Sequence, residues 1–146
     1  MERIDGVVVC VYKLKRGHPR FAVLKRELNW NGWELVKGRM DGEESPEEAA
    51  EREVKEETGI APEKMERLDG MIEWEYEREG TEFHASYRRF MAEVPEDSRI
   101  DTTNNGIEEH SKGLFLNLRD TKDILSYDQH SKLVEETAQK IEDSRE

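Results

Sequence analysis

The chain has 146 residues, which matches one ordinary domain with a buried core, so we expect a single domain over residues 1–146. Its net charge of −12 disfavours a protein that binds nucleic acid through a basic surface, and we expect no stable nucleic-acid partner. It shows no apolar stretch of membrane-spanning length and no signal-peptide pattern, which predicts a cytoplasmic protein without membrane association.

Short apolar runs predict β-strands in the first third of the chain. They cover residues 6–12, 21–24 and 33–36. Turn-forming residues around Gly17 separate the first two runs and favour a hairpin between them. The single cysteine, Cys10, lies inside the first run and is expected to be a small buried residue without a chemical role.

The segment after the third run carries clear helix signals. Ser45 can cap a helix, Pro46 fits the first helical position, and Glu48 completes a capping box. Gly59 can adopt the left-handed conformation that closes a helix. These residues predict a helix from about Pro46 to Thr58.

Three carboxylates share one face of this predicted helix. At about 100° of rotation per residue, Glu53, Glu56 and Glu57 fall within one arc. Like charges this close are unfavourable unless cations compensate them, and carboxylate oxygens suit Mg²⁺ or Mn²⁺. A solvated acidic helix is the alternative for a glutamate-rich stretch, and the loop that precedes the helix favours the metal site.

The stretch from Gly38 to Ile60 resembles the Nudix box, the signature of the Nudix hydrolases. It matches the fixed positions of that pattern at Gly38, Glu44, Arg52, Glu53, Val54, Glu56, Glu57, Gly59 and Ile60. The resemblance implies an α/β fold: the Nudix α/β/α sandwich, with a mixed β-sheet, the loop–helix–loop of the box and a C-terminal helix. It also implies Mg²⁺ (or Mn²⁺) as cofactor and hydrolysis of a phosphoanhydride bond in a nucleotide substrate.

The resemblance further implies roles for individual residues. Glu53, Glu56, Glu57 and the Gly38 carbonyl would be metal ligands, and Glu53 and Glu57 would also be catalytic. Arg52 would hold carboxylates of the box in ligating positions, most simply Glu44 or Glu56. An additional base or ligand is expected from a loop on the other side of the sheet, where Glu109, with Glu108 next to it, is the candidate; a pair of solvated loop carboxylates is the alternative.

The rest of the chain continues the alternation of strands and helices. Aromatic and branched residues predict a second hairpin of two strands, a polar loop precedes a last strand, and helical spacing begins near the C-terminus. The predicted elements are strands at 68–76, 83–94 and 112–118, a loop at 95–106, and an amphipathic helix from Asp128 onward.

Substrate preference has fewer signals. Tyr76 lies at the distance past the box where dinucleoside polyphosphate hydrolases of the family carry a tyrosine that stacks on a base. Lys37 matches a lysine frequent in the same group, and Arg39, like Arg88 and Arg89, could neutralise polyphosphate, against the commoner interpretation of exposed strand charges.

Three hypotheses follow for the function. The first is hydrolysis of dinucleoside polyphosphates such as Ap4A to ATP and AMP. The second is a house-cleaning pyrophosphohydrolase of nucleoside triphosphates, including oxidised ones. The third, from another class, is a catalytically idle nucleotide-sensing or protein-binding module, which the complete set of box carboxylates disfavours.

Overall fold

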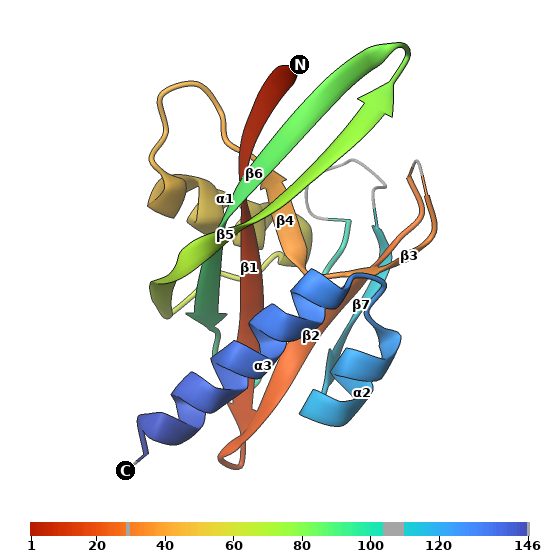
Figure 1. Ribbon diagram of the computed structural model, residues 1–146. Helices are drawn as coiled ribbons and strands as arrows, with labels where there is room; N and C mark the ends of the chain where they lie inside the picture. Colours follow the sequence, from red (N-terminus) through yellow and green to blue (C-terminus); the bar gives the residue numbers. More distant parts are fainter. Residues whose placement is uncertain (29, 104–109, 146) are drawn as a thin grey trace.

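The computed structural model describes residues 1–28, 30–103 and 110–145. The elements are β1 (Glu2–Lys15), β2 (His18–Arg26), β3 (Gly32–Glu34), β4 (Val36–Arg39), α1 (Pro46–Thr58), β5 (Lys64–Arg78), β6 (Thr81–Glu93), β7 (His110–Leu116), α2 (Leu118–Ile124) and α3 (Asp128–Asp143). Figure 1 shows a twisted sheet with α1 on one face and α3 across the other. The predicted α/β class is confirmed.

One mixed sheet contains all the strands described. Its main path runs β3-β2-β1-β6-β5, with β4 added to β1 and β7 added to β2. The β1 and β6 strands are parallel, whereas β5 and β6 form the long antiparallel hairpin that the sequence predicted. The hairpin turns at Glu79 and Gly80, both at positive φ.

The central strand β1 sorts its side chains between the two helix layers. Its odd-numbered Val7, Val9 and Val11 belong to the core on the α1 side, which includes Ala50 and Val54. Its even-numbered residues, Cys10 among them, belong to the core on the α3 side. Alternation of this kind follows from the two-residue period of a strand and produces the predicted α/β/α sandwich.

Two local predictions were incomplete. The run at residues 33–36 is not one strand, because β3 pairs with β2 whereas β4 pairs with β1. The chain changes partner at Leu35, and apolar periodicity carries no information about partners. The second difference is helix α2, which Asn117 caps by accepting the Asp120 N–H. Seven residues with only Thr121 buried are too few to show a helical period.

Cys10 is buried, as expected. The side chain is fully buried, and desolvation by burial raises the pKa of its thiol to about 12. Within the described part of the chain no helix is long and apolar enough to cross a bilayer. A cytoplasmic location stays a prediction.

Candidate active site

Helix α1 begins and ends where the capping residues predicted. Ser45 Oγ accepts a hydrogen bond from the Glu48 N–H at 3.1 Å, and Glu48 Oε1 accepts one from the Ser45 N–H at 2.9 Å. Gly59 closes the helix in the left-handed conformation, with φ of 75°. These caps fix which side chains of α1 face the sheet.

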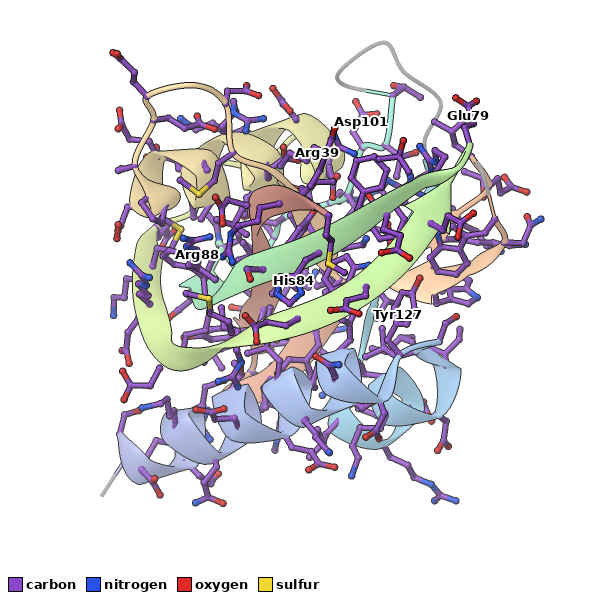
Figure 2. The ribbon with its side chains drawn as sticks, turned by 45° about the horizontal axis from the view of Figure 1, so that its top comes forward. Arg39, Glu79, His84, Arg88, Asp101 and Tyr127 are labelled. Atoms are coloured by element: carbon purple, nitrogen blue, oxygen red, sulfur yellow. The ribbon has the colours of Figure 1, made fainter. Side chains whose placement is uncertain are left out.

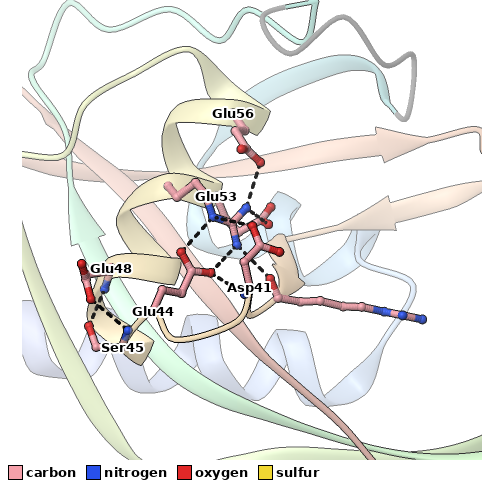
Figure 3. Close-up of polar contacts among 8 residues, drawn as sticks. Asp41, Glu44, Ser45, Glu48, Glu53 and Glu56 are labelled. Carbon is pink, nitrogen blue, oxygen red and sulfur yellow. Dashed lines mark hydrogen bonds and ion pairs between the residues drawn. The ribbon is translucent and has the colours of Figure 1, made fainter.

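Arg52 connects the carboxylates of the box (Figure 3). Its Nη1 donates to Glu53 Oε1 at 2.7 Å and to Glu56 Oε2 at 3.0 Å. Its Nη2 donates to Glu44 Oε1 at 2.7 Å and to the Arg39 carbonyl at 2.8 Å. Arg52 thus contacts Glu44 and Glu56, the two partners expected for it, and also ties the loop and β4 to the helix.

Arg52 does not fully compensate the negative charge of Glu53. The residue is 7% exposed, and desolvation by burial raises the pKa of its carboxyl to about 7, with the negative charge of Glu56 adding to the increase. Hydrogen bonding and charge from Arg52 oppose the shift without cancelling it. One guanidinium shared among several carboxylates therefore leaves this face ready to accept another cation.

Strand β4 lies directly against these carboxylates. A Cβ atom placed on Gly38 would stand 2.2 Å from the Glu53 carboxyl carbon, so only glycine allows the backbone this close. The Lys37 N–H donates to Glu57 Oε1 at 3.1 Å. Strand β4 is thereby held beside Glu53 and Glu57 at Lys37 and Gly38.

The donor set fits a hard divalent cation. Carboxylate and backbone carbonyl oxygens are the ligands that Mg²⁺ and Mn²⁺ prefer. A bound cation would also favour the charged form of Glu53, which burial disfavours. Among residues 1–28, 30–103 and 110–145, no three Asp, Glu, His or Cys side chains converge on one point as metal ligands. Glu53 and Glu56 are instead turned toward Arg52. Glu56, with a side chain 42% exposed, has room to turn toward a metal.

A cleft of about 440 Å³ opens beside this face, and we call it the cationic chamber. Four of its lining residues are basic, and most of the others are aromatic. It is lined by Arg26, Trp30, Lys37, Gly38, Arg39, Trp74, Tyr76, Arg78, Tyr87 and Tyr127. Figure 2 shows Arg39 on the α1 side and Tyr127 near the start of α3, and both residues line the chamber.

The residues predicted to bind substrate meet in this chamber. Lys37 and Arg39 come from β4 and Tyr76 from β5, and Arg39 Nη2 donates to the Tyr76 hydroxyl at 3.4 Å. The other two arginines weighed in the sequence are elsewhere, because Arg88 pairs with Asp5 and Arg89 with Glu136. Arg78 was missed, although its position two residues after Tyr76 puts it on the same face of β5.

Sequence reasoning also missed a buried ion cluster centred on Glu34, which is fully buried. Its Oε2 accepts from His110 Nε2 at 2.8 Å and from Arg26 Nη1 at 3.2 Å, and its Oε1 lies 3.8 Å from Lys37 Nζ. Burial would raise the pKa of Glu34, but the hydrogen bond from His110 and the charges of Lys37 and Arg26 lower it overall. No motif marks Glu34, since its partners come from three different strands.

Glu108 and Glu109, the candidates for an additional base, lie outside the described residues. Their role stays a prediction. The neighbouring His110 is buried against Glu34.

Comparison with known proteins supports the box. The family model described as NUDIX domain matches residues 3–136. An RNA pyrophosphohydrolase from Hahella chejuensis is 41% identical over 70 residues, which are 47% of this chain and 39% of that protein. The matched stretches span between 24% and 39% of the length of the curated relatives.

Solved structures support the fold over nearly the whole chain. An Ap4A hydrolase binary complex from C. elegans superposes with a TM-score of 0.71 at 23% identity, covering 92% of this chain and 95% of that one. The NUDIX domain of Shewanella oneidensis NrtR, complexed with ADP ribose, gives a TM-score of 0.76 at 16% identity, covering 97% and 90%.

Nudix hydrolases generally use divalent metal ions, in keeping with the oxygen-rich face of α1. With a complete box on a capped helix, the matching sandwich fold and a family model that covers residues 3–136, this chain belongs to the Nudix hydrolase family.

Proposed function

We propose that the protein hydrolyses a phosphoanhydride bond in a nucleotide, with dinucleoside polyphosphates such as Ap4A as its best substrates. The observation that carries this proposal is that Gly38, against which the Glu53 carboxylate packs, lines the cationic chamber. Four basic side chains line the chamber at Arg26, Lys37, Arg39 and Arg78. A chain of several phosphates needs that much positive charge next to the acidic helix face.

In this proposal the α1 face holds the metal. Glu53, Glu56, Glu57 and the Gly38 carbonyl would hold Mg²⁺ or Mn²⁺, which supplies positive charge to the phosphate oxygens and lowers the pKa of a bound water. Arg52 keeps Glu53 and Glu56 close to their ligating positions. Glu53 would be a ligand of this metal or the base that accepts a proton from the attacking water.

Tyr76 and Arg39 favour a long substrate. The Tyr76 ring stacks on Phe83 at 5.0 Å between centroids, and its hydroxyl contacts Arg39. These contacts fix an aromatic group at the β5 wall of the chamber, where it can meet a sugar or base beyond the phosphates. We expect Arg39 and Lys37 to bind the phosphates themselves.

A substrate panel tests the proposal. The protein is incubated with Ap4A in Mg²⁺ and separately in Mn²⁺, and the products are separated by ion-exchange chromatography. We expect ATP and AMP. If neither metal supports turnover of Ap4A, the dinucleotide assignment is wrong.

The same panel also tests the second candidate function, that of a nucleoside triphosphate pyrophosphohydrolase. Release of pyrophosphate and a monophosphate from a triphosphate, at a higher kcat/KM than for Ap4A, would favour it. Because the curated relatives are RNA pyrophosphohydrolases, a short RNA with a 5′-triphosphate belongs in the panel. We expect lower activity on this RNA than on Ap4A, since a net charge of −12 disfavours binding of a nucleic-acid backbone.

A further inference from the structure

A second cavity adjoins the cationic chamber, and we call it the aromatic chamber. It has a volume of about 300 Å³ and is lined by Lys37, Ile72, Trp74, Tyr127, Asp128, Gln129 and His130. Lys37, Trp74 and Tyr127 line both chambers, so the two lie side by side. A volume of this size is at the lower end of ligand pockets and suits one flat ring system.

The two chambers differ in charge. The cationic chamber has four basic side chains, whereas the aromatic chamber has only Lys37, on the shared wall, and also carries the Asp128 carboxylate. Because Lys132 pairs with the Asp128 carboxylate at 3.2 Å, phosphate groups meet strong positive charge in the first chamber and little net charge in the second. The second suits an uncharged part of the same ligand.

The aromatic walls are held in place before any ligand arrives. Trp74 packs on Tyr87 with 4.8 Å between ring centroids. Tyr127 packs edge-on against Trp30 at 5.3 Å and lies 5.0 Å from the His130 ring. Rings fixed in this way can stack on a flat ligand without losing further side-chain freedom.

His130 adds a hydrogen-bond donor of defined position. The residue is 3% exposed, and its Nδ1 accepts the Leu35 N–H at 3.2 Å. Burial lowers the pKa of His130 to about 4, with the Lys37 charge adding to the decrease, so the ring is neutral at pH 7. A neutral ring that accepts at Nδ1 carries its proton on Nε2. No contact of Nε2 with another described polar group competes for that proton.

We propose that the aromatic chamber binds the nucleobase of the substrate against Trp74 and Tyr127, with His130 Nε2–H donated to a ring nitrogen or carbonyl of the base. This assignment rests on the proposed function, because it takes the ligand to be a nucleotide. The phosphate chain then passes Lys37 into the cationic chamber and toward Glu53. Tyr76, at the wall of the cationic chamber alone, contacts the remote end of a dinucleotide.

Binding without turnover tests the assignment. Adenosine 5′-monophosphate and ribose 5-phosphate, which lacks only the base, are titrated into ¹⁵N-labelled protein in EDTA. We expect the monophosphate to shift the Trp74 indole N–H and the Leu35 amide, and ribose 5-phosphate to leave both in place. If ribose 5-phosphate shifts both signals equally, or if the monophosphate moves neither, the chamber is not a base site.

Three variants locate the base. We expect Tyr127→Leu and His130→Asn each to weaken binding of the monophosphate about tenfold. Tyr127 is 41% exposed, and the amide introduced in His130→Asn can still accept the Leu35 N–H. Neither variant should change the weak binding of ribose 5-phosphate. Tyr76→Leu, at a residue that lines only the cationic chamber, should weaken monophosphate binding less than Tyr127→Leu does. Glu51→Gln, on the solvent side of α1, is the control and should leave monophosphate binding unaltered.

The opposite pattern, with loss of binding in Tyr76→Leu and none in Tyr127→Leu, would move the base to the cationic chamber and overturn the assignment. Catalysis plays no part in these titrations. A failed hydrolysis assay together with the expected shifts would therefore reject the proposed reaction and keep the base site.

Discussion

Two buried glutamates on opposite sides of Lys37 and Gly38 show opposite electrostatic behaviour. Glu34 is fully buried and Glu53 is 7% exposed, so desolvation disfavours the charge of both. Nevertheless the pKa of Glu34 is lowered, whereas that of Glu53 is raised to about 7. Burial alone therefore does not decide the charge of a carboxylate in this fold.

The difference lies in the supply of cations. Glu34 lies against three basic side chains, Arg26, Lys37 and His110. Glu53 shares Arg52 with the other carboxylates of the box and is repelled by Glu56. The first cluster has its compensating charges within the protein, while the second lacks positive charge, which the proposed divalent cation would supply.

The largest expected effect concerns catalysis on the charge-deficient side. Glu53→Gln and Glu57→Gln should each lower kcat by about 10²- to 10⁴-fold, because each removes a proposed metal ligand or base. Steady-state rates with Mg²⁺ measure the loss, and circular dichroism verifies that the fold is retained. Full activity in both variants would mean that this helix face is not the active site.

For stability, the larger loss is expected from the substitution at Glu34 and not from that at Glu53. Glu34→Gln leaves Arg26 and Lys37 without their carboxylate and should lower the free energy of unfolding by about 3 kcal/mol. Glu53→Gln, measured in EDTA at pH 8, should cause no loss, since it removes an unfavourable charge. Urea unfolding measures both variants. Equal destabilisation would contradict the contrast between the clusters.

The pH dependence of the metal-free protein should record the same contrast. The pKa of Glu53 is raised from 4.5 to about 7 on folding, so the folded state binds more protons and its stability falls as pH rises from about 4.5 to 7. Glu34 has a lowered pKa, and its contribution is present above pH 4.5 and is lost at lower pH.

Thermal unfolding in EDTA from pH 4 to 8 tests this, with Glu53→Gln as comparison. We expect the decline in stability between about pH 4.5 and 7 to be smaller in the variant. Added Mg²⁺ should stabilise the wild type more at pH 8 than at pH 5, because protons compete for the carboxylates. A decline in stability of the same size in the variant would mean that titrating groups other than Glu53 cause it.

The smallest effect is expected on the solvent side of α1. Glu51 pairs with Lys55 at 3.0 Å, and both side chains are about half exposed. Glu51→Gln should change the free energy of unfolding by less than about 0.5 kcal/mol and leave kcat unchanged. This variant controls for removing a negative charge from α1 as such, and a marked loss of activity would weaken the assignment of the metal to the opposite face.

The sequence by itself determined the α1 side of the site. Ser45, Pro46 and Gly59 act on neighbours in the chain, so they set the limits of the helix, and the helical period then puts Glu53, Glu56 and Glu57 on one face. The two-residue period of β1 likewise set the layers of the sandwich. Local geometry is enough for these inferences.

Only the tertiary structure decided what lies across the cleft. Glu34 meets His110, 76 positions away, and His130 meets Leu35, 95 positions away. The aromatic chamber combines β5 with the start of α3, and neither segment alone indicates that it faces the other. Contacts between distant segments depend on strand order and partner, which residue periodicity does not encode.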